Sequence, residues 1–88
     1  MKAVLTYALA ADGFAKIPAA FPGHRARLDE FHARGVLLMA GPIGKPPKGA
    51  LGVFTSREAA QEFVDGDPFV LEGVVSTFTI DEWDEVFV

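Results

Sequence analysis

His24 is the residue of this sequence whose type and placement best suit chemistry. His24, Leu28 and Phe31 are spaced i, i+4 and i+7, so a helix through them places all three on the face that packs against a sheet. In the first turn of such a helix, the positive end disfavours imidazolium and leaves the ring as a neutral general base. A partly buried histidine with a purely structural role fits the same pattern. His32 falls on the opposite, charged side and is expected to be solvated.

Asp67 is the predicted partner of His24. Asp67 precedes Pro68, which is typical of a helix N-cap followed by proline in the first turn. The same carboxylate could hold one ring nitrogen of His24, fix its tautomer and stabilise the charged ring that forms during proton transfer. The capping role and the catalytic role are compatible, and we predict both.

Other kinds of chemical site find little support in the sequence. Cysteine is absent, which excludes disulfides, thiolate nucleophiles and cysteine-based metal sites. The segment 41–46 has the wrong glycine spacing for a phosphate loop and carries Pro46 where Ser or Thr would meet magnesium. Two histidines and scattered carboxylates match no metal-ligand pattern. We therefore expect neither a metal nor a cofactor.

The charge balance limits the classes of partner. Twelve acidic and eight basic residues give a net charge of −4 and an isoelectric point near 4.9. Such a chain offers no broad positive surface for nucleic acid or anionic membranes, so we expect neither. The first ten residues imitate a secretion signal, but the apolar stretch is short and is broken by Thr6 and Tyr7. Together with the lack of cysteine, these features predict a cytoplasmic protein.

The elements that must position the site follow from apolar patterning and turn residues. After the first strand comes an irregular stretch containing Pro18, and Gly35 ends the first helix. Thr55 or Ser56 caps the second helix, with Glu58 completing a capping box. The predicted strands are 2–9, 36–40, 50–54 and 74–80; the predicted helices are 22–34, one through Ala59, Ala60, Phe63 and Val64, and a short one over 68–71; a loop spans 41–49, and 86–88 form an edge strand.

This order is β-α-β-β-α-β, the ferredoxin-like α+β arrangement, formed by a single domain over residues 1–88. Two helices cover one face of such a sheet, yet the second and fourth predicted strands have apolar residues at consecutive positions. Half of the 88 residues are hydrophobic and nine more are glycine. Hydrophobic residues and glycine together usually make up ~45–50% of a chain, so their share here is unusually high. We therefore predict a homodimer in which two sheets pack face to face.

Three short motifs, taken together, resemble the YciI-like (YCII-related) family. They are residues 24–28, then Gly35 with the segment 38–42, then the segment 67–69 followed by Gly73. The resemblance runs along nearly the whole chain. It implies a dimeric α+β barrel of ferredoxin-like subunits, with a His–Asp site between helix and sheet at positions 24 and 67. It also implies a few lyase-type activities, including dehydrochlorination of chlorinated hydroxyquinols, and a kinship in fold with muconolactone isomerases. The loop after Pro42 is shorter here than in longer family members.

These observations lead to one principal functional hypothesis and two alternatives. The first is a cofactor-independent lyase or isomerase in which His24 moves a proton on a small cyclic or aromatic metabolite and Asp67 supports it. Tyr7, Arg27 and Phe69 are predicted substrate contacts. The second is a non-catalytic dimeric module that binds a small ligand or accompanies an enzyme. The third is a cofactorless oxygenase of a quinol.

Overall fold

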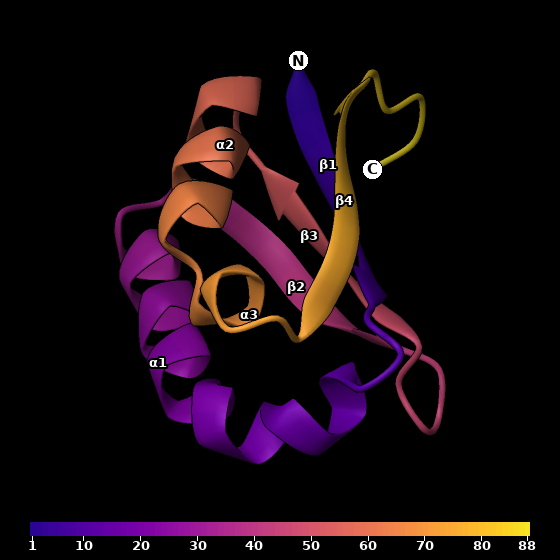
Figure 1. Ribbon diagram of the computed structural model, residues 1–88. Coiled ribbons are helices and arrows are strands. Elements are labelled where there is room, and N and C mark those ends of the chain that lie inside the picture. Colours follow the sequence, from indigo (N-terminus) through magenta and orange to yellow (C-terminus); the bar gives the residue numbers. More distant parts are fainter.

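The computed structural model describes residues 1–88 and has one four-stranded antiparallel sheet with three helices. The strands lie in the order β2-β3-β1-β4 (Figure 1). Along the chain the elements are β1 (Lys2–Leu9), α1 (Gly13–Ala33), β2 (Leu37–Ile43), β3 (Gly49–Phe54), α2 (Arg57–Gly66), α3 (Pro68–Leu71) and β4 (Val75–Trp83). This is the predicted ferredoxin-like arrangement, which is therefore confirmed.

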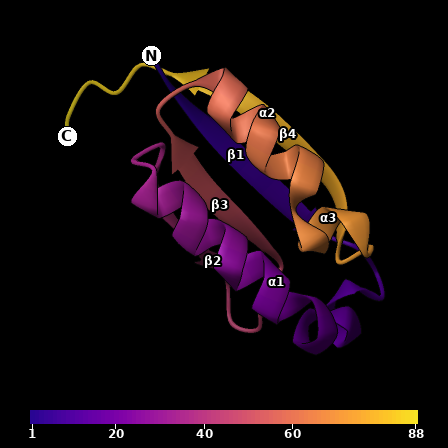
Figure 2. The same cartoon turned by 90° about the vertical axis from the view of Figure 1, so that its left-hand side faces the viewer.

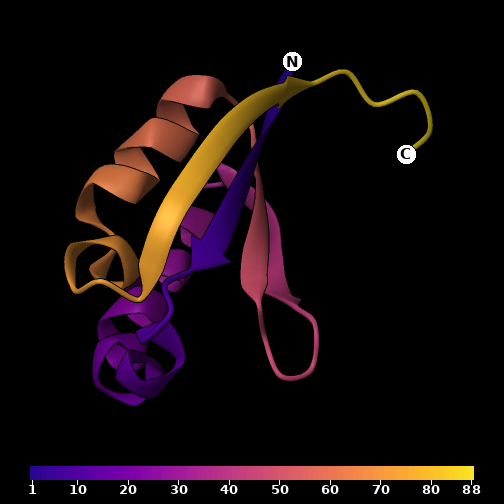
Figure 3. The same ribbon diagram turned by 45° about the vertical axis from the view of Figure 1, so that its right-hand side comes forward.

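All three helices lie on the same face of the sheet, and the chain after β4 leads away from that face (Figure 3). Helix α2 covers β1 and β4, whereas α1 runs beside β2 and β3 (Figure 2). The buried side chains lie between these layers and include Leu5, Phe31, Phe54, Phe63 and Val74. None of the helices is both long and apolar enough to cross a membrane.

Helix α1 begins nine residues earlier than the predicted helix, so the stretch around Pro18 is helical and not irregular. Gly13 approaches the residue before β4 so closely that an added Cβ would lie 2.2 Å from the carbonyl oxygen of Val74. Ala20 is buried in the same part of the helix. This packing outweighs the backbone hydrogen bonds that Pro18 and Pro22 remove, and the helix changes direction along its length (Figure 1).

Strand β2 extends to Ile43, so the predicted loop over 41–49 is shorter than expected. The extension includes Pro42, which pairs with Ala50 of β3. Proline lacks an N–H for the ladder, but β2 is an edge strand and its outer side has no neighbour to pair with. The edge position therefore explains why proline does not end this strand.

The C-terminal half differs from the prediction in three details. The side chain of Ser56 caps α2 by accepting a hydrogen bond from Ala59 N–H at 3.1 Å, so the capping box built on Thr55 is wrong. Strand β4 runs to Trp83, three residues farther than predicted. Residues 86–88 form no strand. The short helix over 68–71 and the helix-ending Gly35, which has φ of +78°, match the prediction.

The sheet face opposite the helices is apolar over only part of its area. The strand register places Met39, Leu51 and Val53 on this face in β2 and β3. In β4 the same face carries Thr77, Thr79 and Asp81, so the prediction that this strand is apolar on both faces is wrong. The apolar area of this outer face therefore belongs chiefly to β2 and β3.

Candidate active site

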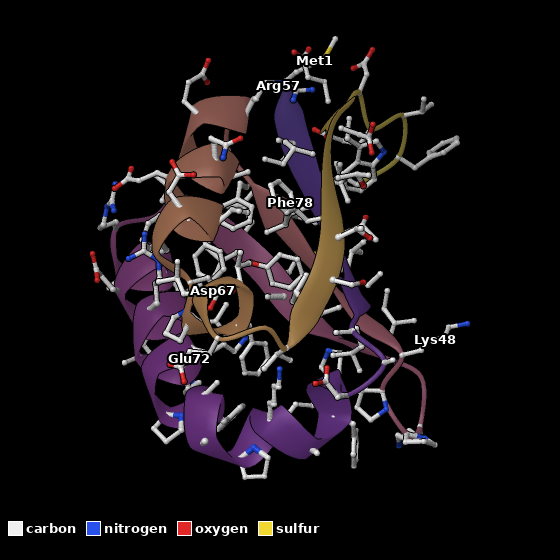
Figure 4. The ribbon with its side chains drawn as sticks, in the orientation of Figure 1. Met1, Lys48, Arg57, Asp67, Glu72 and Phe78 are labelled. Atoms are coloured by element: carbon white, nitrogen blue, oxygen red, sulfur yellow. The ribbon has the colours of Figure 1, made fainter.

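Asp67 is the centre of a buried hydrogen-bond network at the junction of α2 and α3, next to α1 (Figure 4). Its side chain is completely shielded from solvent. One carboxylate oxygen, Oδ1, accepts from Phe69 N–H at 3.1 Å and lies 2.8 Å from Nδ1 of His24. The other, Oδ2, accepts from the Tyr7 hydroxyl at 2.6 Å. Removing a carboxylate from water costs free energy. A buried carboxylate is therefore stable only when its oxygens accept hydrogen bonds, as both oxygens of Asp67 do here.

His24 contributes an imidazole whose two nitrogens have different surroundings. Because an ionised Asp67 can only accept, the short contact requires a proton on Nδ1 of His24. In the uncharged ring Nε2 then carries a lone pair and no proton. The ring lines a cavity, and Nε2 has no protein hydrogen-bond partner, yet it is not a fully buried unsatisfied atom. His24 therefore presents a basic nitrogen to the cavity.

The position of His24 in its helix differs from the prediction. His24 is buried and faces inward, as the spacing with Leu28 and Phe31 indicated. However, α1 begins at Gly13, so His24 lies in the middle of the helix and not in its first turn. The helix-end argument for an uncharged ring is therefore wrong. The orientation of the ring comes from Asp67 instead.

Phe69 fixes the plane of the His24 ring. The two rings are stacked, with centroids 3.7 Å apart and planes 2° from parallel. Helix α1 comes this close to α3 because residue 23 is glycine. A Cβ added to Gly23 would lie 3.0 Å from Cγ of Pro68. The glycine before His24 and the proline after Asp67 thus bring the two side chains together.

Tyr7 belongs to this network as a partner of Asp67. Its hydroxyl donates to the carboxylate, and its side chain is almost fully buried on β1. Burial raises the pKa of the Tyr7 phenol far above its usual range, and the hydrogen bond to Asp67 adds to the rise. Tyr7 thus holds Asp67 in place, and it also lines the cavity beside His24, so its predicted role as a substrate contact stays a prediction.

An alkaline titration can test this environment, because Tyr7 is the only tyrosine in the chain. We expect phenolate absorbance to appear only when the protein unfolds, and not near the ordinary pKa of ~10. Since the folded protein holds this proton and the unfolded chain releases it, stability should fall as pH rises above ~10, by up to ~1.4 kcal/mol per pH unit. Tyr7→Phe should remove that dependence. Ordinary phenol titration with unchanged circular dichroism would contradict this placement.

Arg27 lies outside the hydrogen-bond network of Asp67. Its guanidinium donates to the backbone oxygens of Phe63 at 3.0 Å and Glu62 at 2.7 Å, and it stacks on the ring of Phe31. A Cβ added to Gly66 would meet this guanidinium at 2.7 Å. Arg27 therefore joins α1 to α2 and does not line the cavity. No three His, Cys, Asp or Glu side chains gather where they could hold a metal ion.

The cavity beside His24 has a volume of about 580 Å³ and lies between α1 and the strands β1, β2 and β3. Most of its lining is apolar, and it includes Tyr7 and Phe69, two of the predicted substrate contacts. Its polar rim includes His32, which is exposed as predicted, and the ion pair between Arg25 and Asp29 at 3.1 Å. A glycine within a strand can mark close approach of a ligand, but Gly52 is approached by the ring of Phe54, so no local signal in the sequence locates the cavity.

Comparison with known proteins decides the family. The YCII-related domain matches residues 1–84. The chain belongs to the YCII-related family. The proteins named YciI from Escherichia coli O6:H1 and from Shigella flexneri are each 36% identical to it over 88 residues, an alignment that covers 88% of this chain and 90% of each relative. The resemblance found in the sequence motifs is therefore confirmed.

Solved structures support the fold of this YCII-related protein. The 5-chloro-2-hydroxyhydroquinone dehydrochlorinase TftG from Burkholderia phenoliruptrix AC1100, in complex with 2,5-dihydroxybenzoquinone, matches with a TM-score of 0.79 and 19% identity, covering 96% of this chain and 94% of TftG. An antibiotic biosynthesis monooxygenase matches with a TM-score of 0.59 and 14% identity, covering 97% of both chains. At these identities the likeness establishes a shared fold.

Proposed function

We propose that this protein is a small lyase or isomerase that acts on an oxygenated ring without a cofactor, with His24 as its general base. The observation that carries the proposal is the 2.8 Å contact between Asp67 and Nδ1 of His24, which favours a proton on Nδ1 and a basic Nε2 at an apolar cavity. A base positioned in this way typically contributes ~10²–10⁴-fold to a rate. The likeness in fold to a dehydrochlorinase supports the same class of reaction.

The residues around His24 allow it to accept a proton from a substrate and then to release it. When Nε2 accepts a proton, the ring becomes imidazolium, and the carboxylate of Asp67 at 2.8 Å stabilises that charge. Tyr7 keeps its own proton and holds the second carboxylate oxygen. The parallel ring of Phe69 restrains His24 from turning. One base can thus serve both steps of an elimination.

On a chlorinated hydroxyquinol the reaction would proceed in two proton transfers. His24 removes a ring hydroxyl proton and delivers it to the adjacent carbon that bears chlorine, forming a ketone tautomer. The base then takes a proton from a second hydroxyl, and the C–Cl bond breaks with its electron pair leaving as chloride. The products are a hydroxyquinone, chloride and one proton, so no oxidant is required.

The direct test is chloride release from 5-chloro-2-hydroxyhydroquinone, the compound that TftG is named for. We expect multiple turnovers by the purified protein with no added metal, flavin or nicotinamide. Turnover that appears only with an added cofactor would contradict the proposal. So would the absence of any proton exchange or elimination on this compound and on related hydroxyquinols.

We also propose that two copies pair through the outer sheet face of β2 and β3. Leu51 is 40% exposed and Met39 is 63% exposed on this face, which leaves apolar surface in contact with water. Leu51→Lys should convert the dimer to a monomer in light scattering, because it would bury an unpaired charge. The control Leu71→Lys, on an exposed site of α3, should remain dimeric. A wild-type monomer at micromolar concentration would contradict this assembly.

A further inference from the structure

The floor of the cavity is made of residues with short side chains or none. The strand register places Ala40 opposite Gly52 and Pro42 opposite Ala50, all four on the sheet face that α1 overlies. We call these four residues the small-residue floor. Neighbouring strands are ~4.8 Å apart, and residues i and i+2 are ~6.7 Å apart along a strand. At Gly52 the floor is covered by the ring of Phe54, whose Cε1 would lie 3.1 Å from an added Cβ, and on β1 it is bordered by Leu5 and Tyr7. The open part of the floor therefore lies at Ala40, Pro42 and Ala50.

The cavity above this floor is larger than a single ring needs. A cavity of about 150 Å³ lined by aliphatic and aromatic side chains already holds benzene, whereas this one measures about 580 Å³. Its lining includes residues of β3 from Gly49 to Phe54, a length of ~17 Å at ~3.3 Å per residue. The space therefore extends along the strand beyond the reach of one six-membered ring.

The walls restrict the shape and polarity of the occupant. Phe21 and Leu28 of α1 line the same cavity, so the space is a slot between a helix and the small side chains of the sheet. The buried polar network beside the slot is the one that joins His24, Asp67 and Tyr7. A slot with small side chains on its sheet side leaves room for a flat ring system, and its apolar lining favours a ligand that carries oxygen mainly at its His24 end.

We propose that the site takes a flat, fused-ring compound with an oxygen substituent directed at His24, and that the small-residue floor selects for it. This inference rests on the proposed function only in placing the oxygen at His24. The slot over Ala50 would hold the second ring, since this residue lies on the floor next to Tyr7 in the strand pairing. Filling the floor at Ala50 should exclude that ring.

The test compares three phenols by titration calorimetry. Phenol has one ring, 2-naphthol has two fused rings, and 4-butylphenol has the carbon count of 2-naphthol in a flexible form. We expect 2-naphthol to bind at least ~10-fold tighter than phenol, from the apolar area of its second ring, and tighter than 4-butylphenol. Equal affinity for 2-naphthol and phenol, or a preference for 4-butylphenol, would overturn the proposal.

A floor-filling variant makes the test specific to the site. Ala50→Leu should weaken 2-naphthol binding ~10-fold, should affect phenol less, and should not lower the unfolding temperature, because leucine fills apolar space. Ala40→Leu repeats the test at the sheet edge if Ala50→Leu does not fold. Ala26→Leu, on the exposed side of α1, is the matched control and should bind as the wild type does. Unchanged 2-naphthol affinity in a folded floor variant would contradict the assignment.

The two proposals fail in different ways. If wild type prefers 2-naphthol but catalyses no elimination or proton exchange, the ligand class stands and the proposed function fails. If wild type turns over a single-ring hydroxyquinol through His24 but shows no preference for the fused ring, the function stands and the ligand class fails.

Discussion

Replacing Asp67 with alanine should cost about 3–5 kcal/mol of unfolding free energy, the largest stability loss we expect from one side chain in this site. The carboxylate is fully buried and accepts from Tyr7 and Phe69 while holding His24. Its removal leaves three donors without an acceptor, all of them in buried residues. Urea denaturation followed by circular dichroism measures the loss directly.

Asp65 provides the matched control for this experiment. It lies two residues earlier in α2, is exposed, and accepts a hydrogen bond from Gln61 within the same helix. Asp65→Ala should therefore change stability by no more than ~0.5 kcal/mol. A loss below ~1 kcal/mol for Asp67→Ala would show that the buried network contributes little.

Replacing His24 with glutamine should reduce turnover of the hydroxyquinol ~10²–10⁴-fold while the fold is retained. Glutamine can still donate to Asp67, but it has no basic nitrogen to accept the proton of the substrate. The loss should appear in kcat with little change in KM, because His24 acts on the reacting proton and the apolar walls supply the binding. Chloride release under saturating substrate measures it.

His32→Gln is the corresponding control, since His32 is exposed at the cavity rim and makes no hydrogen bond with Asp67. We expect it to retain nearly the wild-type rate. Asp67→Asn should also slow turnover, because a neutral amide cannot stabilise imidazolium as a carboxylate does. If His24→Gln keeps the wild-type kcat, the proposed base is wrong.

The sequence predicts most of the fold because its local signals agree with the packing. Gly35 ends α1 where the prediction places it, and the Asp67–Pro68 pair opens α3 as predicted. Two of the errors arise at prolines. Pro18 and Pro42 argue locally against a helix and a strand. The contact of Gly13 with Val74 and the edge position of β2 nevertheless allow both elements to continue.

The site is predictable only in part, for a similar reason. Helical spacing turns His24 inward, and the Asp67–Pro68 pair indicates a cap, so both residues can be found from local pattern. The hydrogen bond from Tyr7 and the small-residue floor depend on which residues of β1, β2 and β3 stand opposite one another. That register is a tertiary property, and a one-residue shift would turn these side chains to the other face.

The central claim is that His24 holds its proton on Nδ1, toward Asp67, and offers Nε2 to a ligand in the cavity. Nitrogen NMR of the isotope-labelled imidazole tests it most directly, because protonated and unprotonated ring nitrogens have well-separated shifts. We predict a protonated Nδ1 and an unprotonated Nε2 in the uncharged ring, with 2,5-dihydroxybenzoquinone perturbing the Nε2 signal. A proton on Nε2 in the free protein would contradict the claim, and so would ring-nitrogen chemical shifts that do not change at saturating quinone.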